Sequence, residues 1–184
     1  MSQFELLGAV VCALDSAGID HMVAGSFAST FHGEPRMTQD IDLVIDPDEG
    51  SLMQFVAAFE HPRYYASDAL VALERRDMFN IIEIGSGWKV DLIIRRQRPF
   101  SESEFERRQA VTIGGVKTYV TTVEDSILAK LEWRQKTASD RQMQDVVGML
   151  GTAGDSLDDV YLDHWAVELG VVEGLSEARV AARP

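Results

Sequence analysis

The strand-forming segments of this chain all lie before residue 121, and the pattern after residue 123 is helical throughout. Apolar alternation and hairpin turns predict strands at 21–24, 40–46, 78–84, 88–94, 111–113 and 116–120. Apolar residues at helical spacing predict helices at 3–17, 27–32, 48–60, 123–136, 139–150, 156–169 and 173–182. This order predicts an α+β fold with a mixed twisted sheet and flanking helices in residues 1–121, followed by a helical region in residues 122–184.

The charge of the chain limits the partners that it can bind. Its 184 residues are long enough to bury a core as one domain, and they carry a net charge of −13. An acidic protein repels a polyanion at long range, so general binding to DNA or RNA is disfavoured. The stretch 93–141 is locally cationic, with 10 basic and 7 acidic residues. We expect any phosphate-bearing ligand to meet this part of the chain.

Cysteine content and hydropathy bear on the cellular compartment. The single cysteine, Cys12, excludes an internal disulfide and favours a reducing compartment such as the cytoplasm. Because Cys12 lies in the apolar stretch of the first helical segment, we expect it to be buried. No apolar run approaches the ~18–20 residues of a membrane span. The first residues carry Glu5 and no basic flank, which argues against a signal peptide.

Gly25 and Ser26 stand where the first strand segment gives way to a helix. Glycine allows a ligand to approach the backbone closely, and a helix that starts at Ser26 presents free N–H groups and a hydroxyl. Such a helix start is suited to phosphate. The alternative is that Ser26 only caps the helix.

Three aspartates carry the strongest chemical signal. Asp40 and Asp42 are two positions apart in a strand segment, so both side chains leave the same face, with their backbones about 7 Å apart. Two carboxylates within ~4 Å repel by roughly 4 kcal/mol at an effective dielectric constant of about 20, and a cation between them offsets this repulsion. Oxygen ligands of this kind select Mg²⁺ or Mn²⁺.

Asp91 joins this face if its own strand segment, 88–94, pairs beside 40–46. Three carboxylates can hold two cations ~3.5–4 Å apart, the arrangement used in phosphoryl and nucleotidyl transfer. Asp91 is then the general base that draws a proton from an attacking hydroxyl. The alternatives are an Asp-x-Asp at an exposed strand end and an Asp91 on the solvated face of an edge strand.

Together these residues resemble a known superfamily. Gly25-Ser26, thirteen residues, Asp40-Ile41-Asp42 and a later aspartate in an apolar strand are similar to the polymerase β-like nucleotidyltransferases. Within them, the chain resembles the small bacterial proteins related to the AbiEii abortive-infection toxins. In those proteins an Arg and a Ser or Thr commonly precede Asp-x-Asp, as Arg36 and Thr38 do here, and a helical segment with Lys, Arg and Asp follows. The resemblance spans about residues 20–150.

The resemblance implies a polymerase β-like core and a role for each matching residue. Gly25 and Ser26 would hold the β- and γ-phosphates of a nucleoside triphosphate such as ATP. The three aspartates, Asp40, Asp42 and Asp91, would bind the metal, and Asp91 would also activate the acceptor.

The cationic residues would neutralise phosphate charge in that reading. Lys130 and Arg141 would face the phosphates, and Asp145 would orient one of them. Arg141 and Asp145 are four residues apart and share a helical face, so an ordinary surface ion pair is the alternative. Arg36 and Thr38 would contact the nucleotide, although Arg36 is also consistent with a plain loop charge.

The resemblance implies Mg²⁺-dependent transfer of a nucleoside monophosphate from a nucleoside triphosphate to a hydroxyl or other nucleophile. The alternative is a weakly active or inactive nucleotide-binding member of a toxin–antitoxin pair, with a cognate toxin or antitoxin as its partner. A small molecule, a protein side chain and a short RNA end all remain open as the acceptor. The run from Arg95 to Arg98 is either a solvated strand end or a contact to the acceptor's phosphate.

Overall fold

A computed structural model describes residues 1–33, 40–137 and 139–182 of the chain. The chain forms two compact units. The sheet unit consists of Met1–Ala24 and Thr38–Val120, and the helical unit consists of Gly25–Met37 and Thr121–Pro184. The helix that directly follows the first strand therefore belongs to the same unit as the C-terminal helices.

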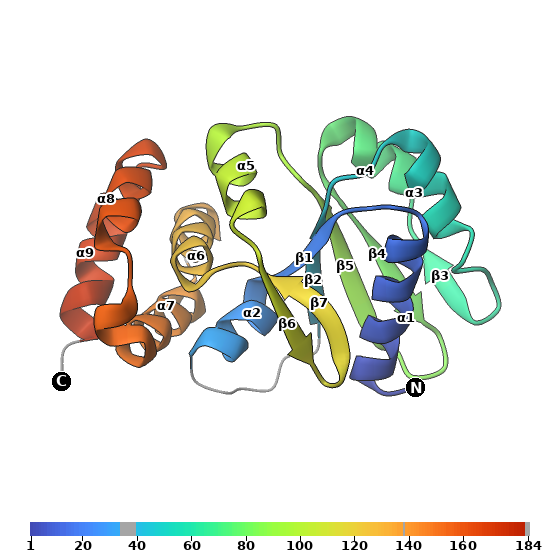
Figure 1. Ribbon diagram of the computed structural model, residues 1–184, viewed down its shortest axis with the longest axis horizontal. Helices are drawn as coiled ribbons and strands as arrows, with labels where there is room; N and C mark the ends of the chain where they lie inside the picture. Colours follow the sequence, from blue (N-terminus) through green and yellow to red (C-terminus); the bar gives the residue numbers. More distant parts are fainter. Residues whose placement is uncertain (34–39, 138, 183–184) are drawn as a thin grey trace. The chain divides into compact units, whose positions relative to one another are not determined.

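The sheet unit is built on one seven-stranded mixed sheet (Figure 1). Its strands are β1 (His21–Ala24), β2 (Asp40–Ile45), β3 (Tyr64–Ala66), β4 (Met78–Glu83), β5 (Lys89–Ile94), β6 (Gln109–Ile113) and β7 (Val116–Val120). Their spatial order is β3-β4-β5-β2-β1-β7-β6. The pairs β2–β5 and β1–β7 are parallel, and the other neighbours are antiparallel.

Alternation along β2 shows why this segment is a central strand. Ile41, Leu43 and Ile45 are fully buried, whereas Asp40 is exposed and Asp42 is half-buried. The apolar residues of β2 continue into β5 on the same face, because Ile41 is paired with Val90. One face of the two central strands is therefore apolar, and the other carries the acids at its amino end.

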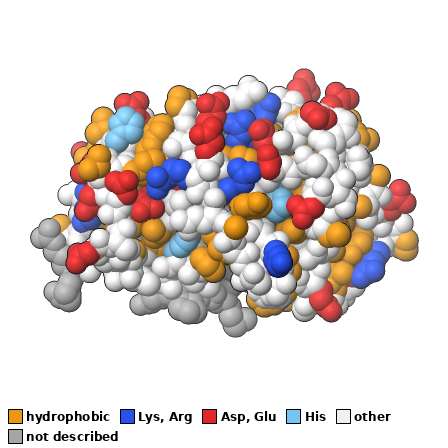
Figure 2. Space-filling model, in the orientation of Figure 1, with side chains coloured by type: hydrophobic (Ala, Val, Ile, Leu, Met, Phe, Trp, Pro, Cys, Tyr) orange, Lys and Arg blue, Asp and Glu red, His pale blue; other side chains and the backbone are white. Residues whose placement is uncertain are grey.

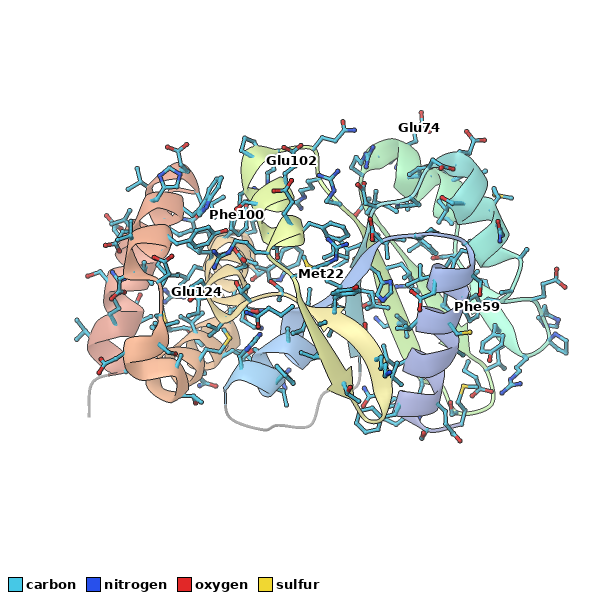
Figure 3. The ribbon with its side chains drawn as sticks, in the orientation of Figure 1. Met22, Phe59, Glu74, Phe100, Glu102 and Glu124 are labelled. Carbon is cyan, nitrogen blue, oxygen red and sulfur yellow. The ribbon has the colours of Figure 1, made fainter. Side chains whose placement is uncertain are left out.

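Four helices belong to the sheet unit: α1 (Gln3–Ser16), α3 (Glu49–Val56), α4 (Ala69–Arg75) and α5 (Pro99–Glu106). Helix α1 begins with a capping box, in which Ser2 accepts from the Glu5 backbone and Glu5 accepts from the Ser2 backbone. It packs against β7, and α4 packs against β4. Met22 from β1 and Phe59, which follows α3, are buried in the interior of this unit (Figure 3).

The helical unit contains α2 (Gly25–His32), α6 (Val123–Thr137), α7 (Asp140–Ala153), α8 (Asp159–Glu168) and α9 (Val172–Ala181). A single 3₁₀ turn, Gly154–Ser156, joins α7 to α8. Helix α2 contacts both α6 and α7, and α9 contacts α6, α7 and α8. The apolar side chains Ile127, Leu128 and Leu131 of α6 are buried among these helices.

The sequence pattern did not predict three short elements, β3, α4 and α5, and it gave the wrong burial for one residue. Strand β3 has three residues and α4 has seven, which is too short for a clear period. Helix α5 does carry a helix-start signal in the sequence, namely a proline at its first position and an acid in its first turn. The burial predicted for Cys12 is wrong, because Cys12 is exposed.

The predicted helix over 48–60 is also shorter than expected, since α3 ends at Val56. The predicted hairpins at 78–94 and 111–120 are both present, as β4–β5 and β6–β7. No helix among the described residues is long and apolar enough to cross a membrane.

Candidate active site

A row of four residues crosses the centre of the sheet, one from each of four neighbouring strands. Ala24 of β1 is paired with Asp42 of β2, Asp42 with Asp91 of β5, and Asp91 with Asn80 of β4. Directly paired residues project from the same face of a sheet, and neighbouring strands lie about 4.8 Å apart. The strand pairing on which the site prediction depends is therefore present, and it brings Asp42 and Asp91 side by side.

Asp40 lies one step along the same face and is paired with Lys89. The Lys89 ammonium contacts Oδ2 of Asp91 at 2.9 Å and Oδ1 of Asp40 at 3.6 Å. Burial alone would lower the pKa of Lys89, but the hydrogen bonds and charges of Asp91 and Asp40 raise it above its ordinary value of 10.5. Lys89 therefore stays charged and partly balances the acids.

Asp91 is the most enclosed of the acids, with 5% of its surface exposed. Asn80 donates a hydrogen bond from Nδ2 to Oδ1 of Asp91 at 2.5 Å. The backbone N–H of Asn80 in turn donates to the hydroxyl of Ser67 at 2.8 Å, which holds the asparagine in place. Sequence reasoning missed Asn80 and Lys89, because only the strand register reveals that they adjoin the acids.

The carboxylates of this face suit a hard divalent cation. The Lys89 ammonium already contacts one carboxylate from each of the two strands. Among the described residues, no group of three or more His, Cys, Asp or Glu side chains is arranged to hold a metal ion. Magnesium characteristically binds through one or two carboxylates together with substrate phosphates, so the residues fit a cation that arrives with a nucleotide.

Gly25 follows Ala24 directly and opens α2, one residue earlier than expected. It has a φ of +59°, a left-handed backbone that favours glycine. The hydroxyl of Ser29 donates to the carbonyl of Ser26 at 3.0 Å, within the first turn. The N-terminus of a helix carries the positive end of its dipole, which makes this turn a candidate anion contact. Arg36 and Thr38 lie outside the described residues.

A second polar cluster lies inside the helical unit, around Lys130. Its ammonium donates to Oδ2 of Asp145 at 2.7 Å and to Oε1 of Gln142 at 3.0 Å, from α6 to α7. Both charged side chains are buried, with 6% and 9% of their surfaces exposed. Ser29 of α2 lies 3.4 Å from the same oxygen of Asp145, so the cluster joins α2, α6 and α7. Arg141 is exposed on α7.

A buried aspartate that sequence reasoning missed stands at the start of α6. Asp125 is fully buried and accepts hydrogen bonds from the hydroxyls of Thr122 and Tyr161, each at 2.6 Å. Its backbone N–H donates to Thr122. Thr-x-x-Asp is a helix-start pattern that was available in the sequence. Because Tyr161 belongs to α8, this contact fastens α8 to α6.

Two arginines of the run after β5 contact side chains of their own unit. Arg95 contacts Asp46 at 2.7 Å and Glu102 at 3.8 Å, and Arg98 donates to the hydroxyl of Ser101 at 3.0 Å. Figure 2 shows basic and acidic side chains side by side over this part of the surface. Arg95 and Arg98 thus have partners within their own unit, and both interpretations of the run stay predictions.

His32 ends α2 with a contact that yields a pH prediction. Its Nε2 lies 2.7 Å from the carbonyl oxygen of Thr121, to which a neutral ring donates. Partial burial lowers the pKa of His32 below its ordinary value of 6.5, although the contact to Thr121 and the charge of Glu124 act in the opposite direction. The unfolded chain therefore takes up this proton more readily than the folded chain.

We expect the free energy of unfolding to fall as the pH drops below 6.5, through the lowered pKa of His32. The replacement His32→Gln keeps a donor for Thr121 and removes the titration. Chemical denaturation of both proteins at pH 7.5 and 5.5 should show a smaller loss in the variant. Equal losses in the two proteins would contradict this assignment.

Comparison with known proteins identifies the fold. No protein-family model and no curated protein sequence matches the chain. The crystal structure of ANT(2″)-Ia in complex with adenylyl-2″-tobramycin is similar, with a TM-score of 0.62 and 14% identity over 92% of this chain and 98% of that chain. The solution structure of the antibiotic-resistance factor ANT(2″)-Ia has a TM-score of 0.61 and 13% identity, covering 95% and 97%.

A third similar structure is that of an antigenic nucleotidyltransferase-like protein from Paracoccidioides brasiliensis. It has a TM-score of 0.55 and 21% identity over 94% of this chain and 90% of that chain. The chain therefore has the polymerase β-like nucleotidyltransferase fold, and the predicted α+β class is confirmed. The finer likeness to AbiEii-related proteins stays a prediction.

Proposed function

We propose that the protein is a nucleotidyltransferase that moves a nucleoside monophosphate from a nucleoside triphosphate to a nucleophile on an acceptor, with Mg²⁺ or Mn²⁺ bound at the acids. The observation that carries the proposal is the direct pairing of Asp42 with Asp91 on one face of the sheet. Neighbouring carboxylates repel each other, and a fold retains them where a cation or a reaction needs them.

The positions of these groups support a proposed role for each. Asp40, Asp42 and Asp91 would hold the divalent cation, which when bound would supply charge neutralisation for the phosphates. Gly25 is bonded to Ala24, the residue paired with Asp42, so its turn is a candidate contact for the triphosphate. Arg36, Thr38, Lys130 and Arg141 remain candidate phosphate contacts on the strength of the family resemblance alone. The contacts of Lys130 with Asp145 support a further role in fixing α2 and α7.

In the transfer step, an oxygen or nitrogen of the acceptor attacks the α-phosphorus of the nucleotide. The bond from that phosphorus to its bridging oxygen breaks, and pyrophosphate leaves with the electron pair. Asp91 would also take the proton of the attacking group, once the contact from Lys89 is released. Asn80 would keep the carboxylate in position through Oδ1.

Of the acceptor classes, a small molecule is the first to test. The related ANT(2″)-Ia structure contains adenylyl-2″-tobramycin, a small-molecule adduct. The acidity of this chain disfavours a long nucleic acid, because binding to one is normally driven by neutralising several phosphates. A protein side chain and a short RNA end are the remaining classes.

Calorimetric titration with ATP, CTP, GTP and UTP tests the proposal. At least one nucleotide should bind in Mg²⁺, and its binding should weaken about tenfold or more in excess EDTA, because the cation would neutralise the phosphates beside the carboxylates. Absence of binding by all four nucleotides in Mg²⁺ would contradict the proposal. Binding without transfer of the α-phosphate to any acceptor class would favour the nucleotide-binding member of a toxin–antitoxin pair, and an adjacent partner gene would support it.

A further inference from the structure

Lys89 lies between two of the acids to which the proposed function assigns a metal. Strand pairing places it opposite Asp40, and it precedes Asp91 by two residues on the same face of β5. Its ammonium contacts Asp91 at 2.9 Å and Asp40 at 3.6 Å. About a third of the Lys89 side chain is exposed, against 7% of the Asp91 side chain. The lysine is thus the mobile partner of an enclosed carboxylate.

The two oxygens of Asp91 are held differently. Oδ1 accepts from Asn80, whose backbone is fixed by Ser67, and Oδ2 faces Lys89. The side chain of Asn80 has two rotatable bonds and is half-buried on the neighbouring strand β4, whereas that of Lys89 has four rotatable bonds and is about a third exposed. A ligand that approaches from the open side of this face can therefore displace Lys89 and leave Asn80 in place.

We propose that Lys89 is a resident counter-cation of the acidic face, the side of the sheet that carries Asp40, Asp42 and Asp91. Lys89 holds Asp40 and Asp91 together and is displaced when a divalent cation binds Oδ2 of Asp91. This inference rests on the proposed function, because it presupposes a metal at these acids. A metal that arrives alone must compete with the ammonium and remain beside its positive charge. A metal that arrives with a triphosphate brings negative charge that accommodates the displaced lysine. Lys89 thereby favours the metal–nucleotide complex over the bare ion.

The replacement Lys89→Met removes the charge and keeps an unbranched apolar stem. We expect the variant to bind Mn²⁺ alone about tenfold more tightly than the wild type, because competition and repulsion are both removed. Binding can be followed by calorimetry and by the electron paramagnetic resonance signal of free Mn²⁺. Neither readout requires an active enzyme or a known acceptor.

Thermal unfolding gives a second readout for the same variants. Without metal, Lys89→Met should melt below the wild type, because its paired carboxylates lose their counter-charge. Mn²⁺ should raise its midpoint by more than it raises that of the wild type, since a ligand of the folded state stabilises it according to its affinity.

Two control variants separate charge at this position from charge in general. Lys89→Arg keeps a cation beside the acids and should keep the weak binding of Mn²⁺. Lys117→Met removes an exposed lysine from β7 of the same sheet and should behave as the wild type does. If Lys89→Met does not fold, Lys89→Gln provides the same loss of charge with a polar side chain.

The proposal is overturned if Mn²⁺ binds the uncharged variants no more tightly than the wild type, or if Lys89→Arg binds it as tightly as Lys89→Met. It is also overturned if no variant binds Mn²⁺ at all. These results are distinct from a failure of the proposed function. If Lys89→Met binds Mn²⁺ more tightly but the protein binds no nucleotide, the counter-cation role of Lys89 is supported and the proposed nucleotidyltransferase function is contradicted.

Discussion

Asparagine in place of Asp42 is expected to abolish Mg²⁺-dependent nucleotide binding. Asp42 is central in the row of paired residues, with Ala24 on one side and Asp91 on the other. Loss of a residue that only supports a metal ligand typically costs 10–100-fold in metal affinity, so loss of the ligand itself should cost about 100-fold or more. Calorimetric titration with the nucleotide that binds the wild type most tightly, in Mg²⁺, measures this loss.

The matched control is Asp46→Asn, on the residue that follows the same strand. Asp46 lies about 13 Å further along the chain direction at the ordinary rise of a strand, and it contacts Arg95 and not the acidic face. This variant should bind nucleotide as the wild type does. Asp42→Asn should remain folded, which circular dichroism and thermal unfolding verify. Wild-type nucleotide affinity in folded Asp42→Asn would refute the metal role of Asp42.

The second large effect is expected on stability, from Asp145→Ala. This change removes the carboxylate that the buried ammonium of Lys130 contacts at 2.7 Å. Breaking a buried ion pair by removing one partner typically costs 3–5 kcal/mol. For a protein of this size the midpoint of thermal unfolding should fall by about 10 °C. Denaturant titration followed by circular dichroism gives the free energy of unfolding.

Two comparisons show whether burial is the cause. The double variant Lys130→Met with Asp145→Leu removes both charges and should recover most of the lost stability. Asp163→Asn breaks an exposed contact with Arg179 on the surface of the helical unit, and should cost less than about 1 kcal/mol. A loss below 1 kcal/mol for Asp145→Ala would mean that water reaches Lys130 and that the pair is not a buried anchor.

The sequence predicted most of the strands and the shared face of Asp40 and Asp42, because both depend on short-range patterns. Alternation in β2 places Asp40 and Asp42 on one face whatever the rest of the chain does. The position of Asp91 depends on a parallel pairing between segments about fifty residues apart, so it was predicted only conditionally. Lys89 and Asn80 carry no signal of their own, and their contacts follow from the register alone.

Other differences between prediction and structure concern burial and contacts, which depend on how a helix packs against its neighbours. Cys12 follows Val11 in an apolar stretch, yet the buried stripe of α1 runs through Leu7, Val10, Val11 and Leu14. One further residue turns the side chain by about 100°, which takes Cys12 out of that stripe. The resemblance predicted that Asp145 would orient one of two cations, and Lys130 is a cation that Asp145 contacts. Which of the two cations, Lys130 or Arg141, Asp145 contacts depends on how α6 packs against α7, and the sequence alone does not show this packing.

The row of Ala24, Asp42, Asp91 and Asn80 also has a consequence for how this protein can vary. These positions are spread over nearly seventy residues of sequence but are immediate neighbours across the strands. Substitutions at touching residues do not have additive effects, so a change at one position alters what its direct neighbours in the row can accept. Homologues should therefore exchange these residues in correlated sets, and a variant library that randomises them singly would miss the combinations that work.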